Sequence, residues 1–220
     1  MTPQILIDIV ETLKVEKIKI AEKVEGEGRV ASLSDEGTII RFLQAHPILG
    51  KYISSGETRA MGDMLVTDYN GVTIHPVNIK TSIGSSDNAT SKGGILYALT
   101  NLRLDQIPFA MGWDKFYNLL DSHKADIEGK DYWFLSVDKN DSSNVMIRGA
   151  KQISKYVENA NPANLLQINW KKEKLAEPVI RTYEESHDTL VNGILRCYIK
   201  AINNLPLAWR KAVVASLNLN

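Results

Sequence analysis

Cysteine is almost absent from this chain. Cys197 is the only one among 220 residues. A single cysteine excludes an intrachain disulfide and a zinc site built from several cysteines. Its neighbours predict a position in the middle of a helix, among core residues, so we do not expect it to act as a nucleophile.

Long apolar runs are also missing. No stretch approaches the roughly 18–20 apolar residues that a membrane-spanning helix needs. The N-terminal residues 1–8 lack the basic start and the long apolar core of a signal peptide. We therefore expect a cytoplasmic protein that does not contact a membrane.

The chain has no net charge, since 26 Lys and Arg balance 26 Asp and Glu. This balance argues against a generally polycationic nucleic-acid binder, but it leaves room for a local basic groove. With 44% hydrophobic and 24% charged residues, the composition is that of an ordinary globular protein with a sizeable core. We expect one domain over residues 1–220, with C-terminal helices over 179–217.

Several familiar catalytic motifs are lacking. The sequence contains no Gly-x-Gly-x-x-Gly turn between a strand and a helix, no phosphate loop ending in Gly-Lys-Ser/Thr, and no Gly-x-Ser-x-Gly elbow. The four histidines are scattered without the spacing of metal ligands: His46, His75, His123 and His187. These absences argue against dinucleotide-binding, P-loop and α/β-hydrolase sites.

What the chain does contain is a strong hairpin signal over residues 62–81. Two strand-forming runs flank Asn70-Gly71, the most reliable short turn signal for a hairpin. Asp63 opens the first strand, and Asn78 and Lys80 lie near the end of the second. Because side chains alternate along a strand, Asn78 and Lys80 share one face. The pattern predicts a carboxylate, a second oxygen and a lysine at one sheet edge, which could hold a divalent metal beside a phosphate.

A helix is expected before this hairpin. Ser32, Ser34 and Asp35 are natural N-cap residues ahead of an apolar run, and Pro47 marks its end. Glu36 lies in the first turn of this helix. It either stabilises the helix dipole or serves as a further carboxylate that faces the site.

The polar stretch that follows Lys80 is rich in Ser, Asn and Gly. It is either an ordinary exposed loop or a loop that contacts substrate, because its small donors and acceptors suit phosphates and base edges. In the second interpretation the DNA-contacting residues are Ser82, Ser85, Ser86, Asn88, Thr90 and Lys92.

A second polar segment, residues 159–172, alternates polar and apolar side chains. It is either an edge strand with a polar outer face or a segment that presents its polar side chains to DNA. Asn and Gln pair well with adenine, and Lys pairs with guanine or phosphate. The candidate DNA contacts here are Asn164, Gln167, Asn169 and Lys171, with Lys172 beside them.

The remaining pattern predicts one α/β unit with a mixed central β-sheet flanked by helices. Residues 131–137 and 145–148 form a second predicted hairpin that extends the same sheet, and residues 150–158 are weakly helical. Further helices are expected over the ranges 3–24, 95–102, 113–128, 179–203 and 207–217.

The spacing of Asp63, Asn78 and Lys80 resembles the PD-(D/E)xK nuclease signature. Fourteen residues separate Asp63 from Asn78-x-Lys80, with Gly62 in place of the proline and Asn78 in place of the second acid. The order of a helix with Glu36, two strands and a further helix resembles the core of that fold. Residues 25–100, and more loosely 165–170, are similar to EcoRV-like type II restriction endonucleases.

This resemblance implies a restriction-endonuclease-like core and a Mg²⁺ site. Asp63 would ligate the metal, Asn78 would supply a second oxygen, and Lys80 would stabilise charge on the phosphate or position the attacking water. Glu36 would support these ligands or bind another metal. The implied protein is a homodimeric, sequence-specific endonuclease that cuts double-stranded DNA at a short palindrome in restriction-modification defence.

Three alternatives remain open at the sequence level. The same fold could serve as a repair or structure-specific nuclease. Because an amide at position 78 brings no negative charge, the chain could instead be a DNA-binding domain without catalysis. It could also be a small α/β protein whose hairpin is only structural.

Overall fold

The computed structural model describes residues 1–16, 18, 20, 28–56, 61–82, 86–88, 91–159 and 166–217. For residues 28–33, 82, 86–88, 214 and 217 it describes the backbone alone. None of the helices within these ranges is long and apolar enough to cross a membrane.

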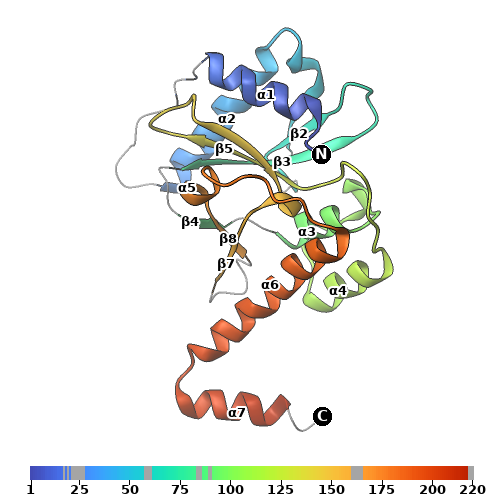
Figure 1. The fold of residues 1–220 in the computed structure, drawn as a ribbon, viewed down its shortest axis with the longest axis vertical. Coiled ribbons are helices and arrows are strands. Elements are labelled where there is room, and N and C mark those ends of the chain that lie inside the picture. Colours follow the sequence, from blue (N-terminus) through green and yellow to red (C-terminus); the bar gives the residue numbers. More distant parts are fainter. Residues whose placement is uncertain are drawn as a thin grey trace.

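A five-stranded mixed sheet forms the centre of the molecule, as the sequence predicts (Figure 1). The first three strands are antiparallel neighbours, the fourth runs parallel to the third, and the fifth is antiparallel to the fourth. In spatial order they are β1 (Ile53–Ser55), β2 (Met64–Thr67), β3 (Ile74–Ser82), β5 (Trp133–Asp138) and β6 (Val145–Gly149).

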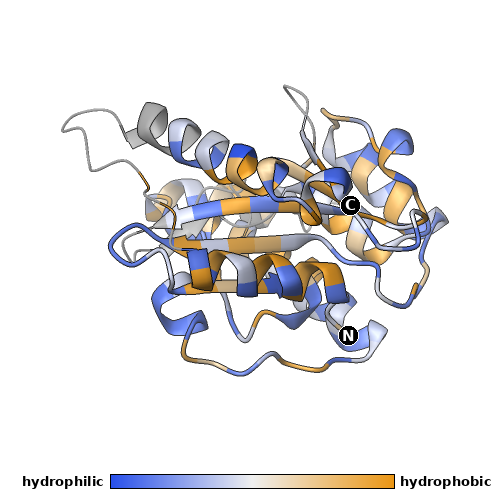
Figure 2. Cartoon of the chain, turned by 90° about the horizontal axis from the view of Figure 1, so that it is seen from above, coloured by the Kyte–Doolittle hydropathy of each residue, from blue (hydrophilic) through white to orange (hydrophobic). Residues whose placement is uncertain are grey.

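Each face of this sheet is covered by helices, and Figure 2 shows apolar residues concentrated where the layers meet. On one face, α1 (Gln4–Glu16) and α2 (Gly28–Ala45) pack over Val77, Ile79 and Leu135. On the other face, Phe134 and Met146 join α3 (Lys92–Leu99), α4 (Trp113–Ser122) and α6 (Tyr183–Asn203). Strand alternation therefore divides the core into two apolar clusters.

The predicted hairpin around Asn70-Gly71 is confirmed as the β2–β3 pair, with a longer turn than a two-residue loop. The Asp68 amide donates to the Thr73 carbonyl at 2.9 Å, and Asp68 and Asn70 side chains accept from the Val72 amide. Gly71 has a φ of 76°, a conformation that favours glycine. The second predicted hairpin is also confirmed, as β5–β6 in the same sheet.

A smaller three-stranded sheet lies beside the central one, in the order β4 (Ser86–Asn88), β8 (Leu166–Asn169) and β7 (Tyr156–Glu158). Of the two interpretations of residues 159–172, the edge strand is wrong, because β8 is the middle strand. The prediction of helix over 150–158 is also wrong beyond one short turn at Ala150–Gln152. Tyr156 and Ile168 pair across the two strands and are buried in the core, which favours extended backbone.

Several helix boundaries differ from the sequence prediction. α1 ends at Glu16, and α2 begins at Gly28, earlier than the expected cap. The helix expected from 179 begins at Tyr183, because Thr182 and Glu185 form a capping box. The amide of Val179 donates to the Gln152 carbonyl at 3.0 Å, which holds the preceding segment outside the helix. The final helix is found as predicted, as α7 (Leu207–Leu217).

Candidate functional site

Asp63 lies just before β2 and reaches across to β3. Its Oδ2 accepts a hydrogen bond of 2.7 Å from the Ile79 amide. Burial raises the pKa of the Asp63 carboxyl, while the hydrogen bond from Ile79 and the charge of Lys80 oppose that rise. A cation beside this partly buried carboxylate would stabilise its charged form.

Gly62 precedes Asp63 where the resemblance would place a proline. A Cβ atom at position 62 would lie 2.9 Å from the Val77 carbonyl oxygen and 3.0 Å from the Val77 nitrogen. These neighbours are backbone atoms of β3 that pair with β2, so they have little freedom to move. The close approach of the two strands therefore accounts for glycine here.

Asn78 and Lys80 lie on the face of β3 opposite Val77 and Ile79, as strand alternation predicts. The Asn78 Oδ1 is buried and has no hydrogen-bond partner among the described residues. Lys80 is half-buried, and its charge interacts with that of Asp63. The three predicted residues thus gather at one end of the hairpin.

Tyr132 is a neighbour of this site that the sequence did not reveal. Burial and the negative charge of Asp63 raise the pKa of Tyr132, whereas hydrogen bonds from Asn78 and Ser91 to its hydroxyl lower it. The tyrosine therefore stays neutral. No motif marks Tyr132, because it reaches the site through the parallel pairing of β3 with β5.

The packing of Tyr132 explains a second glycine. A Cβ at Gly94 would lie 2.8 Å from a Tyr132 ring atom, so only glycine lets α3 approach this ring. Ser91 caps α3, and its Oγ accepts from the Gly94 amide at 3.0 Å. The positive end of the α3 dipole therefore begins beside the Asp63–Asn78 pair, which favours anions such as phosphate.

Glu36 lies on α2, in the helix layer that covers the face of the sheet opposite Asn78 and Lys80. Its neighbour Asp35 is buried and forms an ion pair with Lys139, which follows β5. Asp138, the last residue of β5, pairs in register with Ser82. This contact brings the middle of α2, and half-buried Glu36 with it, to the end of the sheet where β3 terminates, so the prediction that Glu36 lies in the first turn of its helix is wrong.

The two polar segments predicted to contact DNA meet in the small sheet. The register pairs Ser86 with Asn169 and Asn88 with Gln167. Residues far apart in the chain therefore belong to one surface element. Ser85, Thr90 and Asn164 lie outside the described residues, and Ser82, Ser86 and Asn88 are described by their backbone alone.

Some of the residues that were predicted to contact DNA form hydrogen bonds within the protein instead. The Lys92 ammonium donates to the Met111 carbonyl at 2.6 Å and lies 4.3 Å from the centre of the Trp113 ring. The Asn169 Oδ1 caps the short helix α5 (Trp170–Glu173) by accepting from the Lys172 amide. Lys171 is exposed, and Gln167 is half-buried.

The donor set at the hairpin suits a well-hydrated hard cation. In the described part of the chain, no three His, Cys, Asp or Glu side chains cluster as metal ligands. The oxygen atoms at the hairpin that could bind a metal are the Asp63 carboxylate and the Asn78 Oδ1, which is buried without a partner among the described residues. Mg²⁺ prefers oxygen ligands and commonly keeps several waters, so one carboxylate and one amide can hold it.

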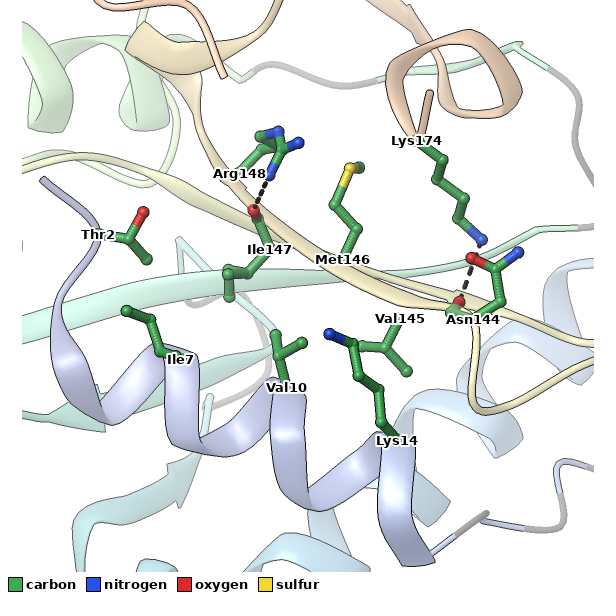
Figure 3. A pocket seen from close by; sticks show the side chains of 10 residues that line it. All are labelled: Thr2, Ile7, Val10, Lys14, Asn144, Val145, Met146, Ile147, Arg148 and Lys174. Carbon is green, nitrogen blue, oxygen red and sulfur yellow. Dashed lines mark hydrogen bonds between the residues drawn. The ribbon is translucent and has the colours of Figure 1, made fainter. Parts of the chain in front are cut away.

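A groove of about 330 Å³ runs along β6, the free edge of the central sheet, with α1 on one side (Figure 3). Its cationic side chains are engaged: Arg148 donates to the Ile147 and Ala176 carbonyls, and Lys174 donates to the Asn144 carbonyl. Such charged cover protects an edge strand from pairing with other chains. We assign this groove a protective rather than a substrate-binding role.

Comparisons of the chain with protein-family models, with curated proteins and with solved structures find no match.

Proposed function

We propose that this protein is a Mg²⁺-dependent, sequence-specific endonuclease that hydrolyses phosphodiester bonds of double-stranded DNA. The observation that carries the proposal is the meeting of Asp63, Asn78 and Lys80 at the end of the β2–β3 hairpin. Asp63 is anchored to the Ile79 amide, and the Asn78 Oδ1 is buried without a partner among the described residues. A buried oxygen of this kind is costly unless a cation or a donor satisfies it.

The order of elements supports the same proposal. Helix α2, the antiparallel strands β1, β2 and β3, helix α3 and the parallel strand β5 follow one another along the chain. The resemblance to PD-(D/E)xK nucleases implies a helix, strands that carry the acidic and lysine residues, and then a further helix. A restriction-endonuclease-like core is therefore the arrangement that we propose for these elements.

The site residues have separate roles in the proposed reaction. A bound Mg²⁺ would neutralise the scissile phosphate and lower the pKa of a water ligand. Asp63 and Asn78 would hold the cation, and Lys80 would stabilise the negative charge that develops on the phosphate. Glu36, in the helix layer on the opposite face of the sheet, would support these groups from a distance.

DNA contact is assigned to the β4–β8 pair and the short helix that follows. This sheet joins the polar loop after β3 to the segment with Gln167 and Lys171. β4 begins six residues beyond Lys80, so the small sheet is close in sequence to the site at which the DNA backbone would lie. Amide side chains suit base edges, and lysines suit phosphates.

Two observations favour a second candidate, a DNA-binding domain without catalysis. Asn78 supplies no negative charge, and no cluster of three ligands of the usual metal-binding types is found among the described residues. The two candidates share the DNA-binding surface and differ in what happens to the DNA.

The test is cleavage of plasmids of varied sequence, with Mg²⁺ or with a chelator. The wild type is expected to cut at one defined sequence in Mg²⁺ alone. Lys80→Ala and Asp63→Asn should each cut at least about 100-fold more slowly, because the first removes the positive charge beside the phosphate and the second removes the charged ligand of the metal. Lys115→Ala, an exposed lysine on α4, is the matched control and should cut normally.

Other outcomes of this cleavage test would point to other functions. Binding without Mg²⁺-dependent cutting would favour the DNA-binding domain, and cutting at branched or damaged DNA would favour a repair nuclease. Equal rates for Lys80→Ala and the wild type would refute the catalytic assignment. Asn78→Asp should stay active with a changed metal preference, whereas complete insensitivity would show that Asn78 is not a ligand.

A further inference from the structure

A cavity of about 640 Å³ opens between segments that are far apart in the chain. The lining segments are residues 1–2, 126–131, 151–152 and 178–181, together with Trp133, Tyr183 and Ser186. Asp63, Asn78 and Lys80 are not among the described residues that line it, so it is separate from the candidate nuclease site. Its volume is that of a small-molecule site, which typically holds about 300–1,000 Å³.

Part of the cavity wall is apolar. The apolar side chains are those of Ile127, Trp133, Pro178, Val179, Ile180 and Tyr183. Trp133 is buried, whereas Ile180 is 96% exposed and is therefore free to pack against a bound molecule. This part of the wall suits the hydrocarbon body of a ligand, because such a ligand would remove apolar surface from water.

The charged side chains of the wall differ in how far they are withdrawn from water. Lys130 and Asp131 are buried, the Lys151 side chain is 17% exposed, and Arg181 is half-buried. The less solvated part of the wall therefore holds three cations and one carboxyl. The other two acids of the wall, Asp126 and Glu128, are exposed to solvent.

Lys130 brings a positive charge that its own partners do not cancel. Its ammonium donates to the carbonyls of Thr100 and Leu102 at 2.6 and 2.5 Å, and both acceptors are uncharged. Burial, and then repulsion from the ammonium of Lys151, lower the pKa of Lys130 to about 8. Lys130 thus remains a cation at neutral pH, and two ammonium groups repel each other in this wall.

The other charges of the wall leave the same positive excess. Arg181 donates to the carbonyls of Lys151 and Ser154 at 2.8 and 3.4 Å, which are again uncharged acceptors. The Lys151 ammonium lies 3.8 Å from the carboxylate of Asp126, which is 63% exposed, and an exposed pair of this kind is weak. Burial raises the pKa of Asp131 to about 7, so its carboxyl is only partly ionised at neutral pH. An anion in the cavity would relieve the repulsion.

Two polar groups of the wall point to the same kind of ligand. Trp133 and Ser186 are each 1% exposed, and their Nε1 and Oγ atoms have no hydrogen-bond partner among the described residues. Buried polar groups without a partner are uncommon in native proteins. Both groups are donors, and an anionic oxygen is the strongest acceptor for such donors.

We propose that this cavity binds a small organic anion, a carboxylate with an apolar body, whose charged partner is Lys151. Lys151 is the cation of the wall whose ammonium has only a weak, long contact within the protein. Lys130 and Arg181 add to the positive potential, and the apolar side chains around Ile180 contact the body of the ligand. The proposal does not depend on the proposed nuclease function.

The test is calorimetry of the full chain with octanoate, without DNA or Mg²⁺. Octanoate is expected to bind with a Kd below about 1 mM, and uncharged 1-octanol should bind at least about 10-fold more weakly. Lys151→Met keeps most of the side-chain length but removes the charge, so it should weaken octanoate binding at least about 10-fold and leave 1-octanol unchanged. Lys115→Met, at an exposed lysine outside the cavity, is the matched control.

A second pair of variants tests the apolar wall. Ile180→Asp places a carboxylate beside the ligand and should also weaken octanoate binding at least about 10-fold. Ile48→Asp is its control, because Ile48 is 60% exposed and lies outside the cavity. Both wild-type residues are exposed, so neither variant disrupts the core. Circular dichroism of each variant verifies the fold.

Tryptophan fluorescence locates the bound molecule. An octanoate that carries bromine at its far end quenches nearby indole rings, and Trp133 is the tryptophan that lines the cavity. The brominated acid should therefore quench the wild type, and most of this quenching should be lost in Trp133→Phe. Trp209→Phe is the control, because Trp209 lies on α7 outside the cavity, and it should keep the effect.

Four results would overturn the proposal. They are the absence of octanoate binding, equal binding of octanoate and 1-octanol, an unchanged octanoate affinity in Lys151→Met, and quenching that survives in Trp133→Phe. Inorganic phosphate that displaces octanoate at equal concentration would assign the cavity to simple anions and would overturn the apolar part of the proposal. Failure of the protein to cut DNA would leave this proposal intact, since the binding test contains neither DNA nor metal.

Discussion

Asn78 is the residue where the proposed chemistry departs from a pair of acids. An amide oxygen can ligate a hard cation, but its orientation matters because the amide nitrogen would repel the metal. In this structure a hydrogen bond to the Tyr132 hydroxyl engages Asn78, and its Oδ1 is left without a partner among the described residues. We therefore expect Tyr132 to act as a positioning residue for Asn78.

Tyr132→Phe tests this role. The variant keeps the ring that packs on Gly94 and Phe134 but removes the hydroxyl. We expect Mg²⁺ binding, measured by calorimetry without DNA, to weaken about 10-fold, as is typical when the partner of a metal ligand is lost. Tyr156→Phe is the control, because its hydroxyl donates to the Ala150 carbonyl and its loss should reduce stability alone. Unchanged Mg²⁺ affinity in Tyr132→Phe would contradict the positioning role.

The buried carboxyl of Asp131 leads us to expect that the stability of the fold depends on pH, independently of the candidate site. Its buried carboxylate accepts from the Tyr132 and Lys151 amides, and burial raises its pKa from 3.8 to about 7. The folded state therefore favours the protonated form. Its contribution is fully present below about pH 4 and is lost as pH rises to about 7, a change of at most about 4 kcal/mol.

The measurement is urea unfolding of the wild type and Asp131→Asn at several pH values. The variant stays uncharged, so the stability of the wild type relative to it should fall between pH 4 and pH 7 and then level off. Asp126→Asn, an exposed carboxylate in the same loop, should follow the wild type. Parallel curves for the wild type and Asp131→Asn would show that Asp131 does not titrate in this range.

At the scale of elements, the two hairpins depend on local turn chemistry. The β2–β3 turn is held by Asp68 and Asn70 and closes at Gly71, where φ is positive. These are short-range interactions, and the sequence predicts them well. The β7 and β8 strands are different, because each is only three or four residues long and is stabilised by pairing and burial in the core.

A pair of glycine substitutions tests whether the β2–β3 turn depends on these short-range interactions. Gly71→Ala should lower the free energy of unfolding by about 1 kcal/mol, because alanine is strained at positive φ. Gly37→Ala, inside α2, should raise it by up to about 1 kcal/mol, because the new Cβ meets only the movable end of Arg41. Urea unfolding of both variants measures the difference, and a shift in the same direction for both would contradict the assigned turn.

At the scale of the whole molecule, the proposed function predicts how the two strands of DNA are cut. If two copies of the chain act together, each supplies one site with Asp63, Asn78 and Lys80, and both strands of a palindrome are cut in a single binding event. Plasmid DNA should then be converted directly to linear product.

The products on a gel distinguish the possible outcomes. A nicked intermediate should not accumulate with the wild type. Nicked circles that form first and are only later converted to linear plasmid would show that the two strands are cut in separate binding events.

The sequence by itself determined the features that depend on neighbours within a few residues. These are the Asn70-Gly71 hairpin, the second hairpin, most of the helices, and the common face of Asn78 and Lys80. Periodicity and turn chemistry act over such short distances, so they are visible in the chain. The single cysteine likewise fixed the absence of an intrachain disulfide.

Only the tertiary structure decided which distant segments meet. It brought Tyr132 to Asn78, joined β4 to β8, directed Lys92 to Trp113, and left Ile199 and Trp209 exposed. Each of these depends on packing between residues that are many positions apart or on what a helix fails to contact. No local pattern carries that information, because the core that selects these contacts forms only when the whole chain folds.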